Sequence, residues 1–158
     1  MIRVGAAGAL LLLACRPPES NPAVVAEQAA ANDTLRGTLL LEGSDPFPIA
    51  VLQTSGGRVT VDNASAPMRK LAQLELWMRG TRTSDTRFVV ADYRVRAVNG
   101  VKAWDGFLRR GPTGFRLELD DGTSHEIRSA PASFAQFTRS RMWITENPDG
   151  TVREYGVF

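Results

Sequence analysis

Hydrophobic and polar residues alternate along much of the chain from residue 35 onward, with the period of two that is typical of β-strands. Phe115, Leu117 and Leu119 alternate with charged residues, and a longer alternating run covers residues 89–98. Turn signals separate such runs at residues 55–57, 99–100, 120–122 and 148–150, each of which contains glycine. This pattern predicts a mainly β protein whose short strands form an antiparallel sheet or barrel.

Two series of residues, one in each half of this region, are similar to each other. Ala66-Pro67 is followed by the segments 71–74 and 76–78, and Ala130-Pro131 is followed by the segments 134–137 and 142–144. Each proline suits the first turn of a short helix, where a missing N–H costs nothing. Each half is therefore predicted to contain three strands, a short helix and two further strands.

This order, with its helix between the third and fourth strands, resembles the OB fold. The resemblance implies two packed OB-like antiparallel β-barrel units, over residues 35–98 and 101–158, each with a short helix before its fourth strand. One larger barrel with two similar segments is the alternative. Units of about 60 residues are only marginally stable alone, and the sequence Val98-Asn99-Gly100-Val101 predicts a two-residue hairpin between them. We therefore expect the units to pack rigidly together.

The first 15 residues have the pattern of an export signal. A basic start at Arg3 precedes an apolar run over residues 4–13, which is shorter than the roughly 20 residues that span a bilayer. The run ends in Leu12-Leu13-Ala14-Cys15, which resembles the lipobox of bacterial lipoproteins. The resemblance implies that the signal peptide, residues 1–14, is removed and that Cys15 becomes an acylated N-terminus. An ordinary signal peptide with a chance cysteine, or an N-terminal helix, is the alternative.

Two or more acyl chains, such as palmitate, hold a protein firmly on a membrane. The resemblance therefore implies a cell-envelope lipoprotein whose membrane partner is reached through Cys15. Arg16 follows the cysteine where Asp would favour the inner membrane, so a cell with two membranes would carry the protein on the outer one, facing the periplasm. Residues 15–34 are rich in Pro, Ala, Ser and Asn and predict a flexible tether with a reach of roughly 25 Å.

Composition narrows the possible chemistry. A hydrophobic content of 43% and a charged content of 23% are typical of a globular protein, and the net charge of +2 gives no reason to expect a nucleic-acid partner. One Cys and one His cannot build a disulfide framework or a Cys/His metal cluster. Phosphate-loop, dinucleotide, EF-hand and G-x-S-x-G motifs are absent from the sequence. We therefore expect no cofactor, no metal and no catalytic residues, and interpret His125 as a partly buried or surface side chain.

A candidate ligand-binding surface comes from the arginines of the first predicted unit. Trp77 is expected to share a strand face with Arg79, and Arg94 and Arg96 are expected on the outer face of the next strand. Antiparallel pairing would join these faces into an aromatic and basic surface, which could stack a sugar and bind its anionic group.

Two architectural interpretations compete with this surface. Trp77 and Trp143 occupy matching places in the two series, which favours a role in packing for both. The arginines can equally form a solvated face that is paired with Asp85 and Asp92.

The function expected from the sequence is a non-catalytic binding or structural role in the cell envelope, with a protein or an anionic glycan as the further partner. The alternatives are an envelope enzyme with a carboxylate-based site and an OB-type module that binds a glycan or another anionic ligand. Two carboxylates about 5–10 Å apart in a cleft would favour the enzyme.

Overall fold

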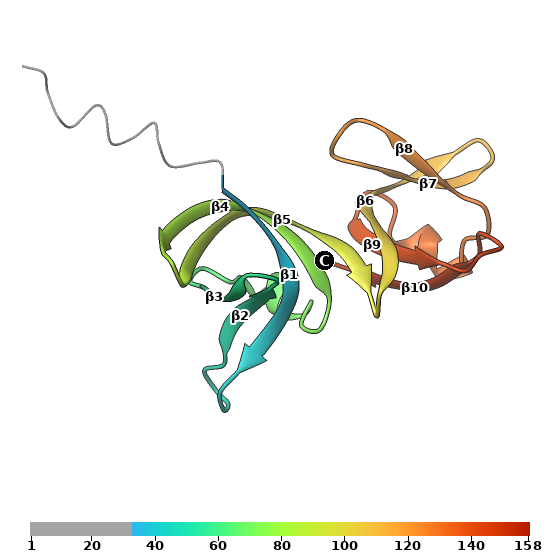
Figure 1. Cartoon of the computed structure of the whole chain (residues 1–158). Helices are drawn as coiled ribbons and strands as arrows, with labels where there is room; N and C mark the ends of the chain where they lie inside the picture. Colours follow the sequence, from blue (N-terminus) through green and yellow to red (C-terminus); the bar gives the residue numbers. More distant parts are fainter. Residues whose placement is uncertain (1–32) are drawn as a thin grey trace, which may run out of the picture.

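The computed structural model describes residues 33–158, which form a mainly β protein with ten strands and two single-turn helices (Figure 1). The strands are β1 (Asp33–Glu42), β2 (Ile49–Thr54), β3 (Gly57–Val61), β4 (Glu75–Ser84), β5 (Arg87–Val98), β6 (Val101–Gly111), β7 (Gly114–Glu118), β8 (Ser124–Ile127), β9 (Arg141–Glu146) and β10 (Val152–Val157). The predicted signal peptide over residues 1–14, Cys15 and the tether up to residue 32 lie outside the described residues.

The fold class expected from the sequence is confirmed in its broad form, because the protein is mainly β and its strands pair antiparallel except for β3 with β5. The expected end of the tether is wrong by two residues. Asp33 and Thr34 belong to β1, where they stand opposite Gly80 and Arg79 of β4, so backbone pairing extends the strand into the polar segment.

The first five strands are paired in a closed order. Strand β1 pairs with both β2 and β4, β2 pairs with β3, and β5 pairs with both β3 and β4. The pairings therefore return to the strand from which they started. The largest buried side chains of the associated core are Leu39, Leu52, Met68, Leu76, Met78 and Phe88.

The last five strands follow the same order. Strand β6 pairs with both β7 and β9, β7 pairs with β8, and β9 pairs with β10. A single parallel bridge between Ser129 and Thr151 takes the place of the β3–β5 pairing. A second core lies among these strands and comprises Leu108, Leu117, Ile127, Phe134, Met142 and Ile144.

The two short helices differ from the expectation. Helix α1 (Ala66–Arg69) has only four residues, with Pro67 in its first turn as predicted, and the hydroxyl of Ser65 accepts a hydrogen bond from the Met68 N–H at 3.3 Å. The second helix, η1 (Ala132–Gln136), is a 3-10 turn and not an α-helix. Pro131 precedes it at the N-cap and offers no side-chain acceptor, so the turn lacks the cap that supports α1. Among residues 33–158, no helix has the length and apolar character needed to cross a membrane.

Two glycines allow the first strand of each half to change partners. The first part of β1 pairs with β4 and its second part with β2, and the two pairings overlap at Gly37 and Thr38. Gly106 lies at the matching place in β6, next to Phe107, where pairing passes from β9 to β7. A Cβ atom would lie 2.2 Å from the Gln53 carbonyl oxygen at Gly37, and 2.4 Å from that of Glu118 at Gly106. Only glycine fits where the neighbouring backbone approaches so closely.

The predicted hairpin between the two halves is confirmed. Val98 and Val101 are paired, and the turn residues Asn99 and Gly100 have φ angles of 51° and 77°, as a two-residue hairpin with this twist requires. In Figure 1 this hairpin, drawn where β5 meets β6, joins the two groups of strands, and the C-terminus lies between them.

A buried ion pair lies beside this junction. The Asp105 carboxylate on β6 accepts hydrogen bonds from Arg141 Nε on β9 at 2.9 Å and from the Val95 N–H on β5 at 2.8 Å. Arg141 also donates to the Tyr93 carbonyl oxygen, and its guanidinium stands 4.6 Å from the centre of the Phe158 ring. The pair therefore ties β5 to strands of the second half.

Burial has opposite consequences for the two groups of this pair. It raises the pKa of Asp105, and the hydrogen bonds from Arg141 and Val95 offset only part of that effect. For Arg141 burial acts to lower the pKa, but the hydrogen bond and charge of Asp105 outweigh it, so the net shift is upward. The guanidinium of Arg141 therefore stays charged, whereas burial makes the charged form of Asp105 less favourable than it is in water.

Candidate functional site

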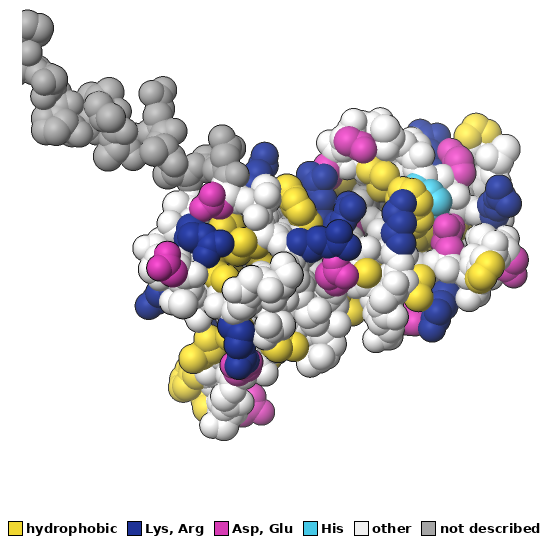
Figure 2. Space-filling model, in the orientation of Figure 1, with side chains coloured by type: hydrophobic (Ala, Val, Ile, Leu, Met, Phe, Trp, Pro, Cys, Tyr) yellow, Lys and Arg dark blue, Asp and Glu magenta, His cyan; other side chains and the backbone are white. Residues whose placement is uncertain are grey.

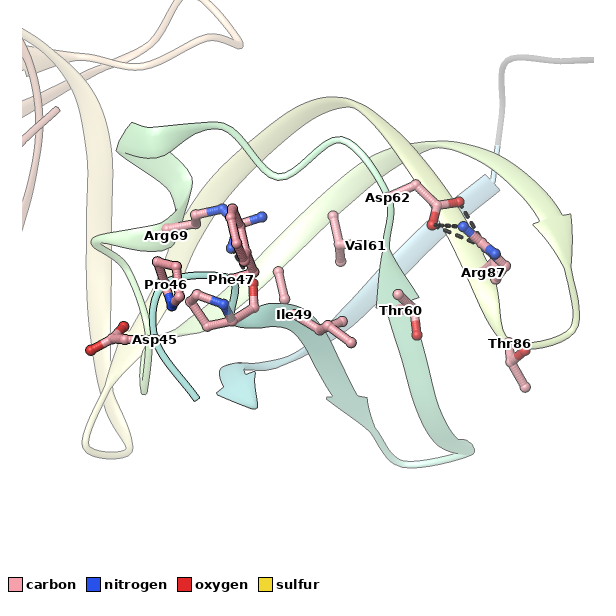
Figure 3. Close-up of a pocket in the computed structure, with 12 residues that line it drawn as sticks. Asp45, Pro46, Phe47, Ile49, Thr60, Val61, Asp62, Arg69, Thr86 and Arg87 are labelled. Atoms are coloured by element: carbon pink, nitrogen blue, oxygen red, sulfur yellow. Dashed lines mark hydrogen bonds and ion pairs between the residues drawn. The ribbon is translucent and has the colours of Figure 1, made fainter. Parts of the chain in front are cut away.

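A large hollow opens beside the end of the β1–β2 hairpin (Figure 3). Its volume is about 860 Å³, and it is lined by residues 45–50, 60–62 and 86–87 together with Arg69 of α1. These residues come from the loop between β1 and β2, from β2 and β3, and from the turn between β4 and β5. We refer to it as the Phe47 hollow.

One side of the Phe47 hollow is apolar and unusually open to solvent. Phe47 is 84% exposed and Ile49 is 55% exposed, so neither side chain has a partner in the core. Pro46 and Pro48 flank the aromatic residue and restrict its backbone. Arg69 donates hydrogen bonds to the carbonyl oxygens of Pro48 and Ala64, which ties this loop to the segment before α1. The backbone on which Phe47 stands is therefore restricted by the flanking prolines and tied to Arg69 at Pro48.

The other side of the hollow is polar. Arg87 donates from Nη2 to Asp62 Oδ1 at 2.7 Å and from Nε to both carboxylate oxygens at 3.0 and 3.2 Å. These hydrogen bonds hold the pKa of Asp62 below its usual value, and Asp62 in turn raises the pKa of Arg87. Both groups therefore keep their charges, and each cancels the charge of the other.

Figure 3 shows the two sides in relation to each other. Pro46 and Phe47 lie at one end, Asp62 with Arg87 at the other, and Ile49 and Thr60 between them. An apolar wall that faces a polar, charge-matched wall suits a ligand with one apolar face and several neutral hydrogen-bonding groups.

The structure brings together most of the residues that the sequence singled out. Trp77 and Arg94 stand opposite each other on β4 and β5, with the guanidinium 5.1 Å from the centre of the indole ring. Arg79 lies 3.9 Å from Asp92 across the same strand pair. Arg96 lines a separate hollow of about 160 Å³, which it shares with Arg94.

Carboxylates accompany these arginines. Arg94 lies 3.5 Å from Asp92 and 2.7 Å from Asp120, the second being a contact of charges and not an aligned hydrogen bond. Arg82 donates instead to the backbone carbonyl of Asp85 at 2.9 Å. Figure 2 shows Lys and Arg side chains gathered over the middle of the molecule with Asp and Glu side chains beside them. Because Arg94 covers the Trp77 ring and is itself paired, this surface offers less free charge and less free aromatic area than its sequence indicates.

The two tryptophans in matching places have different surroundings. Trp143 packs against the core of the first half, and its indole lies so close to Gly156 that a Cβ there would be 2.6 Å from Nε1. Trp77 instead carries Arg94 over its ring. The matching positions therefore do not give the two indoles the same environment.

A third aromatic cluster was not anticipated from the sequence. Trp104 on β6 stacks on His125 at 4.0 Å between ring centres, and Lys102 Nζ lies 3.5 Å from the centre of its ring. His125 Nε2 is 3.0 Å from Glu146 Oε2, and the histidine side chain is partly buried, one of the two environments expected for it. Lys102 and Trp104 are two residues apart on one strand, a spacing from which their shared face was predictable. Within residues 33–158, no three His, Cys, Asp or Glu side chains gather as a possible metal site.

The Phe47 hollow was also missed. The available signal was the sequence Pro46-Phe47-Pro48, which places a large aromatic residue in a stiff loop between two strands. Alternation of polar and apolar residues carries no information about such a loop, because the loop has no strand face.

Comparison with known proteins finds one informative similarity. The chain is 26% identical over 145 residues to the myxobacterial hemagglutinin of Myxococcus xanthus. The match covers 87% of this chain and 52% of that protein, so the chain spans about half the length of this relative. No protein family matches the sequence, and no solved structure matches it.

Proposed function

We propose that this protein is a non-catalytic carbohydrate-binding domain and that the Phe47 hollow is its binding site. The observation that carries the proposal is the 84% exposed ring of Phe47, which stands across the hollow from the paired side chains of Asp62 and Arg87. A sugar ring has an apolar face that stacks on an aromatic side chain and hydroxyl groups that bind charged partners. The name of the similar M. xanthus protein, hemagglutinin, is in keeping with a role in binding cell-surface glycans.

The charge of the site supports binding over hydrolysis. A glycosidase needs one carboxyl group that is protonated and can donate to the leaving oxygen. The pKa of Asp62 is shifted in the opposite direction by Arg87. Asp45, the other acidic residue of the hollow, is drawn in Figure 3 at the far end with its carboxylate pointing outward.

We propose further that the chain contains two OB-like units, over residues 35–98 and 101–158. The support is the repeated order of strand pairings and the matching positions of Gly37 and Gly106. In OB folds the face of strands 2 and 3, with the loops between strands 1 and 2 and between strands 4 and 5, binds oligosaccharides and oligonucleotides. The Phe47 hollow is lined by the corresponding elements of the first unit.

Phe47→Ala is expected to weaken glycan binding at least ~10-fold, which corresponds to the roughly 1.4 kcal/mol that a stacked aromatic ring readily supplies. The wild-type protein is first screened on an array of neutral and acidic glycans. The affinity of both proteins for the best neutral oligosaccharide is then measured by titration calorimetry. Because Phe47 is almost fully exposed, its replacement should leave the thermal unfolding temperature unchanged.

Phe107→Ala is the matched control, since Phe107 is an exposed aromatic residue on β6 that does not line the Phe47 hollow. Its affinity for the same oligosaccharide should equal that of the wild type. If the array shows no glycan binding, or if Phe47→Ala binds as tightly as Phe107→Ala, the hollow is not a carbohydrate site.

The domain is further proposed to be lipid-anchored in the cell envelope through Cys15, on the outer membrane of a cell with two membranes. Cys15→Ala is expected to release the protein from the membrane fraction or to block removal of residues 1–14, since no thioether can form. Fractionation followed by immunoblotting and mass spectrometry of the N-terminus measures both. A Cys15→Ala protein that is cleaved normally and stays in the membrane fraction would contradict the anchor.

A further inference from the structure

A second hollow, of about 400 Å³, lies in the second half of the protein beside the turn between β6 and β7. Four arginines line it: Arg109, Arg110, Arg116 and Arg139. Three of them come from the two strands of this hairpin, and Arg139 comes from the segment between η1 and β9. We refer to it as the arginine hollow.

Most of this positive charge is unmatched. Arg109 Nε lies 2.7 Å from Glu118 Oε2, whereas Arg110, Arg116 and Arg139 form no ion pair with any residue in the described part of the chain. Of the four guanidinium groups, only that of Arg109 therefore has a carboxylate partner in the described part of the chain. This contrasts with the surface around Trp77, where Asp92 and Asp120 accompany the arginines.

Arg116 is directed to the hollow although a carboxylate is close along the sheet. Glu126 stands opposite Arg116 across the β7–β8 pair, yet the two side chains form no ion pair, and Glu126 lines a different hollow with His125. Arg116 Nη1 instead approaches Gly111, at 3.5 Å from the place where a Cβ atom of that residue would be. The guanidinium therefore lies over the β6–β7 turn and beside the other arginines.

Two unfavourable features converge on the arginine hollow. Arg109 and Arg116 are direct cross-strand partners, and like charges in that position destabilise an antiparallel pair. Arg139 has a φ of 80°, in the left-handed region that is costly for a residue other than glycine, and its N–H bonds to the Leu108 carbonyl oxygen at 2.8 Å. Backbone strain of this kind clusters at functional sites. A bound anion would also relieve the repulsion between the arginines.

We propose that the arginine hollow binds a phosphate or sulfate monoester. Guanidinium groups are planar donors that bind the oxygens of such anions two at a time. A bound phosphate monoester carries up to two negative charges and a sulfate monoester carries one, so either would neutralise part of the unmatched charge. The volume lies within the range of small-molecule sites and accommodates the anionic group with an attached sugar or glycerol. The ester can belong to a soluble saccharide or to a lipid whose phosphate is a monoester, as in phosphatidic acid. This site shares no residue with the Phe47 hollow and does not depend on the function proposed for it.

The test uses the whole chain carrying Cys15→Ser, so that no lipid is attached. Titration calorimetry at low salt measures the affinity of the protein for glucose 6-phosphate and for glucose 6-sulfate. Glucose is the neutral control, and inorganic phosphate is the competitor. A parallel arm measures sedimentation of the protein with vesicles that contain phosphatidic acid, a phosphate monoester, and with phosphatidylglycerol and phosphatidylcholine vesicles as the diester controls. Binding in the first arm identifies a soluble ester, and binding in the second arm alone identifies a lipid headgroup.

Three variants distinguish binding in the arginine hollow from attraction by the net charge of the protein. Arg116→Gln is expected to weaken binding at least ~10-fold, as loss of a charge-assisted contact does. Arg139→Gly should weaken binding similarly while the thermal unfolding temperature stays the same or rises, because glycine tolerates the left-handed backbone. Arg153→Gln removes an exposed charge on β10 and should change affinity less than ~2-fold.

Two results would overturn the proposal. One is the absence of binding to both soluble monoesters and to phosphatidic acid vesicles at low salt. The other is binding that Arg116→Gln and Arg139→Gly reduce no more than Arg153→Gln does, since that would show attraction by net charge alone.

Discussion

Asp105→Ala is expected to lower the free energy of unfolding by about 3–5 kcal/mol, the cost of breaking a buried ion pair. The Asp105 side chain is only 3% exposed, and its removal leaves the guanidinium of Arg141 without its carboxylate partner between β5 and β9. The Val95 N–H loses its acceptor at the same time. Because these residues join the two halves of the protein, we expect unfolding of both halves to shift to lower denaturant concentration together.

Chemical denaturation followed by tryptophan fluorescence and circular dichroism measures this change. Glu118→Ala is the control, since it breaks the exposed pair with Arg109 and should cost less than about 1 kcal/mol. The double variant Asp105→Leu with Arg141→Met should recover much of the loss, because it leaves no unpaired charge and the Asp105 pKa is raised by burial. A single variant as stable as the wild type would show that water reaches this junction.

Gly37→Ala and Gly106→Ala are each expected to destabilise the protein by about 3 kcal/mol, at the upper end of what added core atoms cost. The new methyl group would lie 2.2 Å from the Gln53 carbonyl oxygen in Gly37→Ala and 2.4 Å from the Glu118 carbonyl oxygen in Gly106→Ala. Such a contact involves paired backbone and cannot be relieved by rotating a side chain. Each strand would have to shift where it changes from one partner to the other.

Gly56→Ala is the matched control for both, because its nearest contact would be the Thr54 hydroxyl at 3.9 Å. Thermal unfolding of the three variants should show a large loss for two of them and almost none for Gly56→Ala. Similar losses at Gly37 and Gly106 are what two repeated units require. A large loss at only one of them would count against the proposed repeat, and a neutral result at both would contradict the close approach itself.

Local features of the fold were predictable from residues that are near one another in the chain. The alternation over residues 89–98 predicted β5, and Asn99-Gly100 predicted the hairpin that follows it, since both depend on the backbone preferences of adjacent residues. The length of the helices was less predictable. Pro67 and Pro131 both stand in a Ser-Ala-Pro sequence, yet only Ser65 caps an α-helical turn. Ser129 instead forms a β-bridge with Thr151, and η1 follows with Pro131 at its N-cap.

The candidate sites depend on contacts between distant segments. The sequence places Trp77 and Arg94 on neighbouring strands, which is how the structure pairs them. It does not reveal that Asp120, from the turn after β7 in the other half, approaches Arg94. That contact changes a free basic surface into a paired one, and no pattern within residues 75–98 contains it.

By itself the sequence determined that the protein is mainly β, where most strands and turns lie, and which side chains are available for chemistry. Only the tertiary structure decided that Phe47 is left uncovered in the hollow that Asp62 and Arg87 also line, and that four arginines line one hollow while only Arg109 has a carboxylate partner. The physical reason is that strands and turns form according to residues that are adjacent in the chain. Burial and charge pairing depend instead on distant segments that strand pairing brings together. In the Phe47 hollow, residues 45–50, 60–62 and 86–87 meet because β3 pairs with β5 beside the β1–β2 hairpin, and no local pattern records that pairing.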